Sequence, residues 1–224
     1  MNILLIGNSY TSRNDLANLL KTLCRENGKD VTVRSVTQGG RKMIQYTNGE
    51  DPMTARLQET LQEGHYDAVF LQEQSLLPLL DFEAFLTGMQ FVGHMVRSHT
   101  SSLIMYATWA RKEGSPDLET YHWTPNSMAR DLFEAYSRVA RVLQAAVSPV
   151  GISFYHAIAA APEIELYDPD RYHPSYLGSC LAALTHYCTL FGSFPEKTAS
   201  MALGEKELAV FEAAVSMAAK RLPA

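Results

Sequence analysis

Short apolar runs alternate along this chain with longer segments in which apolar residues recur every three or four positions. The runs lie at residues 3–6, 31–36, 68–71, 103–107 and 150–154. Each run is long enough for a buried strand and far too short to cross a membrane. Because strands that alternate with helices are typical of βαβ units, the pattern predicts a parallel sheet with helices on both faces.

The segments between and after these runs carry the helical spacing. Their apolar faces cover residues 16–23, 82–96, 128–143, 176–187 and 208–215. No internal repeat, low-complexity stretch or linker divides the 224 residues, so we expect one domain that spans residues 1–224. The predicted fold class is α/β: a three-layer α/β/α sandwich of flavodoxin-like topology, with a central parallel sheet of about five strands.

Composition argues against several classes of function. The formal net charge is −5 and no run of Lys and Arg is longer than a pair, which argues against a nucleic-acid partner. Cys24, Cys180 and Cys188 have no spacing typical of metal ligands, and the last two fall in a helical segment, where we expect buried free thiols. The first apolar run lacks the basic flank and cleavage site of a signal peptide, so we expect a cytoplasmic protein with no membrane partner.

Polar residues and a glycine follow the predicted strands. They lie outside the carboxyl ends of the strands, at the edge where sheets of this kind bind ligands. They are Ser9 after the first run, Gly40 after the second, Gln72 and Gln74 after the third, and Asp170 with His173 near the C-terminus. Each also has a purely structural interpretation. Asn8, Ser9 or Thr11 could cap a helix, the glycine could form a turn, and the Asp and His could satisfy backbone groups of a loop.

Together these residues supply what acyl transfer requires. A serine hydroxyl is a weak nucleophile without a base, and His173 could accept the proton of Ser9. The imidazole needs an acceptor on its second nitrogen, and Asp170 could provide it. The oxyanion of the tetrahedral intermediate needs donors, and the candidates are the N–H groups of Ser9 and Gly40 and the side-chain amide of Gln74 or Gln72.

The same motifs resemble those of the SGNH (GDSL-type) hydrolases. The sequence GNSYT at residues 7–11 is similar to the first block of that family, with Asn8 where aspartate is usual. The glycine of the second block corresponds to Gly40. The sequence DRYHPS at residues 170–175 matches the Asp-x-x-His block, which is the most specific of these elements.

The resemblance implies roles for particular residues and one departure from the family. It implies a catalytic triad that needs no cofactor and no metal, formed by Ser9, His173 and Asp170. The third block of the family is normally Gly-x-Asn-Asp, whereas the sequence LQEQS at residues 71–75 contains no asparagine. A block with glutamine is similar to that of carbohydrate-esterase branches, so the third oxyanion donor would be Gln74 or Gln72.

We therefore expect a serine esterase that hydrolyses small acyl esters. The resemblance implies O-acetyl groups on a carbohydrate, so the expected partner is a small acyl ester or an acylated carbohydrate. Two alternatives stay open. One is a non-catalytic glycan- or ligand-binding module of the same fold, which the departure in the third block favours. The other is a metal hydrolase that uses Asp168, Asp170, His173 and His122, although no second ligand motif accompanies them.

A loop-rich segment at residues 110–126 follows the fourth predicted strand. It should lie over the carboxyl edge of the sheet, where His122 and Trp123 could form a wall of the substrate pocket. The alternative is that Trp123 only anchors the loop.

Overall fold

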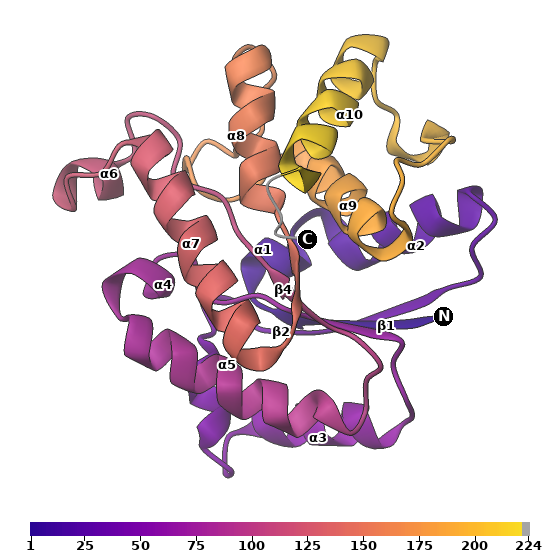
Figure 1. The fold of residues 1–224 in the computed structure, drawn as a ribbon, viewed down its shortest axis with the longest axis vertical. Coiled ribbons are helices and arrows are strands. Elements are labelled where there is room, and N and C mark those ends of the chain that lie inside the picture. Colours follow the sequence, from indigo (N-terminus) through magenta and orange to yellow (C-terminus); the bar gives the residue numbers. More distant parts are fainter. Residues whose placement is uncertain (221–224) are drawn as a thin grey trace.

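The computed structural model describes residues 1–220, and this part of the chain contains a parallel sheet of five strands (Figure 1). The strands are β1 (Asn2–Gly7), β2 (Thr32–Thr37), β3 (Ala68–Leu71), β4 (Leu103–Tyr106) and β5 (Ala146–Ser148). Their order across the sheet is β2-β1-β3-β4-β5, and every neighbouring pair is parallel. This is the flavodoxin-like order, and the predicted fold class is confirmed.

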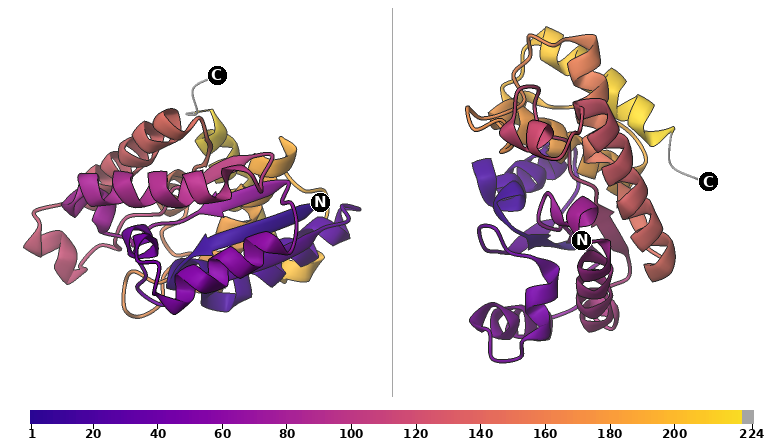
Figure 2. Two further views of the ribbon diagram at one scale, coloured as in Figure 1. Left: turned by 90° about the horizontal axis from the view of Figure 1, so that it is seen from below. Right: turned by 90° about the vertical axis from the view of Figure 1, so that its left-hand side faces the viewer.

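Helices cover both faces of the sheet (Figures 1 and 2). One face is covered by α2 (Leu16–Glu26), α8 (Val150–Ala160), α9 (Tyr176–Phe191) and α10 (Glu205–Ala219). The other is covered by α3 (Pro52–Gln62), α5 (Phe82–Arg97) and α7 (Pro125–Leu143). The shorter elements are α1 (Ser9–Ser12), α4 (Leu77–Leu80), α6 (Pro116–Thr120) and the 3₁₀ turns η1 (Arg13–Asp15), η2 (Met43–Thr47) and η3 (Ala199–Met201). No helix within residues 1–220 has both the length and the apolar character that a membrane span requires.

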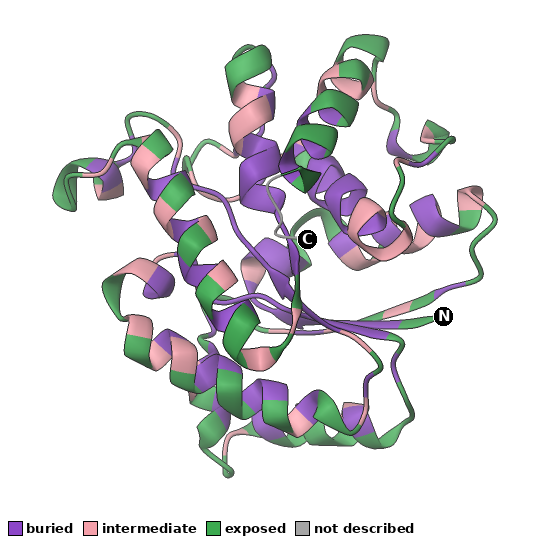
Figure 3. Ribbon diagram, in the orientation of Figure 1, coloured by how far each residue is buried: buried purple, intermediate pink, exposed green. Residues whose placement is uncertain are grey.

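The strand residues divide between two hydrophobic cores because successive side chains of a strand point to opposite faces. In β1, Ile3 and Leu5 belong to the core that includes α2, α8, α9 and α10. Leu4 and Ile6 belong to the core that includes α3, α5 and α7. All four side chains are fully buried, as expected for a parallel sheet that is covered on both sides (Figure 3). Polar groups that must meet a ligand are therefore confined to the edges of the sheet.

The fifth strand is the one element that the apolar runs misplace. A strand was expected at residues 150–154, but the strand is Ala146–Ser148 and the apolar run begins helix α8. Every residue of that run is buried, so the first turns of α8 have no polar face. A helix that is buried all round cannot be distinguished from a buried strand by periodicity. The other four strands and the five expected helices are confirmed.

Helix α5 approaches the turn η2 closely at Gly88. An added Cβ at Gly88 would lie 2.4 Å from the backbone nitrogen of Ile44 and 2.7 Å from the carbonyl carbon of Met43. We expect Gly88→Ala to lower the free energy of unfolding by about 1–3 kcal/mol, because backbone must shift to admit the methyl group. Denaturant unfolding measures the loss.

Gly93→Ala, in the same helix, is the matched control for this prediction. The nearest atoms to its Cβ would be side-chain carbons of Leu143, at 3.3 Å, and of Leu103, at 3.5 Å, and alanine favours a helix over glycine by about 1 kcal/mol. We expect little change or a small gain in stability. Equal losses in the two variants would contradict the close packing at Gly88.

Candidate active site

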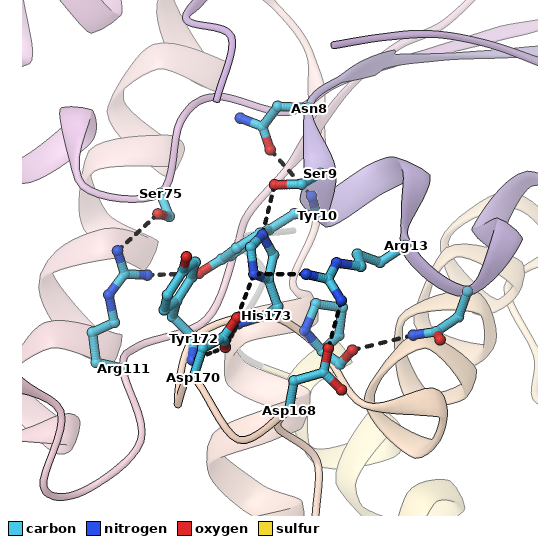
Figure 4. Close-up of polar contacts among 12 residues, drawn as sticks. Asn8, Ser9, Tyr10, Arg13, Ser75, Arg111, Asp168, Asp170, Tyr172 and His173 are labelled. Atoms are coloured by element: carbon cyan, nitrogen blue, oxygen red, sulfur yellow. Dashed lines mark hydrogen bonds and ion pairs between the residues drawn. The ribbon is translucent and has the colours of Figure 1, made fainter. Parts of the chain in front are cut away.

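Ser9 is the first residue of α1 and follows β1 after a single residue, Asn8. The side chain of Asn8 accepts a hydrogen bond from the N–H of Tyr10 at 3.2 Å and so caps the helix. The hydroxyl of Ser9 is thereby free of the capping role. Its Oγ lies 2.8 Å from Nε2 of His173 (Figure 4).

His173 lies in the loop before α9, within a turn that Asp170 closes. Oδ1 of Asp170 accepts hydrogen bonds from the N–H of Tyr172 at 3.1 Å and from the N–H of His173 at 2.9 Å. This turn sets the two functional side chains next to each other, and Nδ1 of His173 lies 2.7 Å from Oδ2 of Asp170. The structure therefore joins Ser9, His173 and Asp170 in one chain of hydrogen bonds.

Proline is common at the first position of a helix, but Pro174 does not begin α9. Ser175 is the N-cap, its Oγ accepts a hydrogen bond from the N–H of Gly178 at 3.1 Å, and the helix begins at Tyr176. Ser175 sets the start of the helix because its hydroxyl accepts a hydrogen bond from an N–H of the first turn, which a proline cannot do. His173 consequently keeps a loop conformation, from which its ring reaches α1.

The charge of Asp170 suits its contact with the imidazole. Partial burial disfavours the carboxylate, but hydrogen bonds from the His173 ring and from the N–H groups of His173 and Tyr172 outweigh burial and lower the pKa of Asp170. An ionised Asp170 holds the proton on Nδ1 and leaves Nε2 able to accept one. Nη2 of Arg13 lies 3.4 Å from the same Nδ1, which then has no lone pair to offer, and Arg13 instead binds Asp168 at 2.8 Å.

Ser9 opens into a cavity of about 380 Å³ at the carboxyl edge of the sheet. The lining residues are Asn8, Ser9, Tyr10, Gly40, Gln74, Ser75, Arg111, Asp117, Tyr172 and His173. Four of the residues singled out in the sequence thus meet here, while Gln72 lies outside the lining and Asp170 lies behind His173.

Two backbone N–H groups of the lining are available to a ligand. Within residues 1–220, neither the N–H of Ser9 nor that of Gly40 donates a hydrogen bond to the protein. Gly40 has a φ of +68°, in the left-handed region that favours glycine, so the turn after β2 requires this residue type. Both groups fit the role of oxyanion donors that the sequence led us to expect.

The two glutamines differ in what their amides do. Gln72 is fully buried, and its Oε1 accepts hydrogen bonds from the N–H of Asn8 and the hydroxyl of Thr11, both at 2.9 Å. Oε1 of Gln74 accepts from two backbone N–H groups at the start of α4, both at 2.9 Å. Nε2 of Gln74 has no acceptor in the described chain and belongs to a residue that lines the cavity. This geometry favours Gln74 over Gln72 as a third donor.

Arg111 is a site residue that the sequence did not indicate. Arg111 is only 4% exposed, and its guanidinium donates to the hydroxyl of Tyr10 at 2.6 Å and to Oγ of Ser75 at 3.1 Å (Figure 4). It also donates to Oδ2 of Asp117 at 2.6 Å. It thus joins three other segments of the cavity wall. In the sequence Arg111 is half of a basic pair, which is typical of an exposed surface. Its place shortly after β4 was the one signal available.

The structure does not bring His122 and Trp123 to the cavity. His122 is exposed, and Trp123 packs on a small separate core with Leu118 and Met128. The second interpretation, in which Trp123 anchors the loop, fits these contacts. Within residues 1–220, no group of three or more His, Cys, Asp and Glu side chains is placed to hold a metal ion.

The chain is similar to known proteins in structure rather than in sequence. The sequence matches no protein-family model and no curated protein. Solved structures do match. A candidate SGNH hydrolase from Slackia heliotrinireducens has 27% identity and a TM-score of 0.74, over 85% of this chain and 98% of that one. A DUF4886 family protein from Bacteroides uniformis has 16% identity and a TM-score of 0.81, over 99% and 95% of the two chains.

An acetylxylan esterase from Geobacillus stearothermophilus, a catalytic mutant, is also similar, with 14% identity and a TM-score of 0.60 over 85% of this chain and 94% of that one. These matches confirm the resemblance to the SGNH hydrolases that the sequence motifs carry. The chain is similar to SGNH hydrolases, and esterases are among the solved structures that share its fold. The branch with a glutamine in the third block stays a prediction.

The different contacts of the two glutamines generate a prediction. We expect Gln74→Ala to lower kcat by about 10²–10³ with little change in KM, because one oxyanion donor is lost. Gln72→Ala removes an acceptor that holds Asn8 and Thr11, so we expect it to lower thermal stability as well as activity. Steady-state kinetics and thermal unfolding of both variants measure this. Unchanged turnover in Gln74→Ala would mean that backbone groups alone form the oxyanion hole.

Proposed function

We propose that this chain is a serine esterase in which Ser9 is the nucleophile, His173 the base and Asp170 the residue that orients the base. The observation that carries the proposal is the continuous chain of hydrogen bonds, 2.8 Å from Ser9 to His173 and 2.7 Å from His173 to Asp170. Nucleophile and base within hydrogen-bond reach, with the base oriented by a third group, is the arrangement that activates a serine hydroxyl.

The reaction proceeds in two halves on this geometry. Nε2 of His173 accepts the hydroxyl proton of Ser9 as Oγ attacks the ester carbonyl. The resulting oxyanion accepts hydrogen bonds from the N–H groups of Ser9 and Gly40 and from the side-chain amide of Gln74. The intermediate collapses, the C–O bond to the alcohol breaks, and His173 returns the proton to the departing alcohol. Water then attacks the acyl carbon while His173 accepts a proton from it, the bond between that carbon and Oγ of Ser9 breaks, His173 returns the proton to Oγ, and the carboxylic acid leaves.

The substrate class follows from the cavity lining. Apart from Gly40, the described lining residues are polar or aromatic, and none has an aliphatic hydrocarbon side chain. Such a wall gives a long acyl chain little apolar surface to bury against beyond the rings of Tyr10 and Tyr172. Arg111, Asp117 and Ser75 instead offer donors and acceptors that suit the hydroxyl groups of a sugar. We infer O-acetyl esters of a carbohydrate, in line with the acetylxylan esterase among the neighbours.

Covalent labelling tests the triad. We expect a fluorophosphonate probe to label the intact protein once, and Ser9→Ala to abolish both labelling and the turnover of p-nitrophenyl acetate. His173→Ala should lose activity to a similar extent, at least about 10³-fold, because members of such a unit act together. Intact-mass spectrometry and initial rates, both with EDTA present, measure this.

Ser12→Ala is the matched control, because Ser12 is exposed at the end of the same short helix. It should label and turn over as the wild type does. Undiminished activity in Ser9→Ala would refute the triad. Saturable binding of an acetylated sugar without turnover would instead identify the chain as a binding module.

Acyl-chain length tests the substrate class. We expect kcat/KM for p-nitrophenyl esters to fall by about tenfold or more from acetate to octanoate, because the lining has no aliphatic side chain against which the added methylene groups could pack. Initial rates across the acetate, butyrate and octanoate series measure the trend. A rise toward octanoate would place the enzyme with esterases of longer acyl chains.

A further inference from the structure

Glu73 stands between the two glutamines after β3, and its side chain is fully buried. Its carboxylate accepts hydrogen bonds from backbone N–H groups of two separate segments. The N–H of Gln74 lies 2.6 Å from Oε1 of Glu73. The N–H of Met43 lies 3.0 Å from the same Oε1 and 3.2 Å from Oε2. The carboxylate therefore bridges the loop after β3 and the turn η2.

These two segments carry the donors of the proposed oxyanion hole. Gly40 comes shortly before Met43, and between them the carbonyl of Arg41 accepts a hydrogen bond from Nδ2 of Asn8 at 3.0 Å. The turn with Gly40 is thus tied to the nucleophile segment on one side and to Glu73 on the other. The loop with Gln74 is tied to the same carboxylate. Moving Glu73 would move both donors relative to Ser9.

We propose that Glu73 is a positioning residue that fixes the distance between the Gly40 N–H and the Gln74 amide, so that both meet the oxyanion formed at Ser9. This inference rests on the proposed esterase function. Glu73 does not touch the substrate, because it lies outside the cavity lining. It acts through the backbone of Met43 and Gln74.

A charged group serves this purpose better than a neutral one. Hydrogen bonds to an ionised acceptor are shorter and stronger than those to a neutral one, and a carboxylate can accept from both segments at once. Burial raises the pKa of Glu73 to about 7, and the N–H groups of Gln74 and Met43 oppose that rise, with a smaller contribution from the exposed Lys42. The other group that faces it is Tyr136, whose hydroxyl accepts the N–H of Glu73 at 3.2 Å.

Protonation of Glu73 would weaken the bridge, since the carboxyl group then has a donor where an acceptor is needed. Protonation of Glu73 should therefore contribute to the acid limb of log kcat against pH, and this contribution should make the limb steeper in the wild type than in a variant without the carboxyl group.

The experiment compares Glu73→Gln with Tyr136→Phe. Glu73→Gln keeps the shape of the side chain and removes the charge, and we expect kcat to fall about tenfold or more, with KM within about threefold and an acid limb shallower than that of the wild type. Tyr136→Phe removes the acceptor of the Glu73 N–H but leaves the carboxylate. We expect it to keep kcat within about threefold and to keep the steep acid limb, whatever stability it loses.

Thermal unfolding supplies a readout independent of activity. A folded-state pKa raised above the unfolded value means that the folded protein binds more protons between about pH 4.5 and 7. The wild type should therefore lose stability relative to Glu73→Gln as pH rises through that window. If Glu73→Gln does not fold, Glu73→Asp replaces it, and the shorter carboxylate should lower kcat while the steep acid limb remains.

The outcomes separate this inference from the function on which it rests. A wild type without turnover and without labelling at Ser9 would refute the esterase. An active wild type whose kcat and acid limb are the same in Glu73→Gln would refute the positioning role alone.

Discussion

The segments that follow three neighbouring strands meet at Asn8, and the geometry of the cavity depends on that junction. Its Oδ1 caps α1, its Nδ2 donates to the carbonyl of Arg41 at 3.0 Å, and its backbone N–H donates to Gln72 at 2.9 Å. An aspartate could accept the capping bond but could not donate to a carbonyl, whereas an amide does both. The asparagine at the position where aspartate is usual in SGNH hydrolases thus holds the Gly40 turn against the segment that carries Ser9.

The sequence predicted the fold well because the fold follows from burial. A strand covered on both faces must be apolar throughout, and a helix packed on one side must be apolar every three or four residues, so both patterns are visible in a single chain. The prediction of the fifth strand failed because burial on all sides produces the same apolar pattern in a helix as in a strand. Residues 150–154 are buried on all sides as a helix, and the sequence pattern of such a helix equals that of a strand.

The candidate site was predictable only in part, for a related reason. Ser9, Gly40 and His173 carry residue types that the chemistry demands, so their types and their places after strands point to them. The sequence does not single out Arg111 and Glu73, because most charged residues lie on the solvent-exposed surface of a protein. Their burial results from partners far along the chain, such as Tyr10 for Arg111 and Met43 for Glu73. Such contacts exist only after the sheet has brought the segments together.

Buried polar groups in this protein keep or lose their charge according to what surrounds them. His186 lies deep in the core between aromatic rings, and burial alone lowers its pKa to about 3, so it is neutral. Glu73 and Arg111 are buried to a similar degree, but donors or acceptors from several segments converge on each at the carboxyl edge. Convergent dipoles offset much of the cost of burying a charge, and they also fix the segments that supply them. In the proposed reaction, donors must already be in place when negative charge develops on the substrate, and the fixing of these segments is what makes a costly buried charge useful.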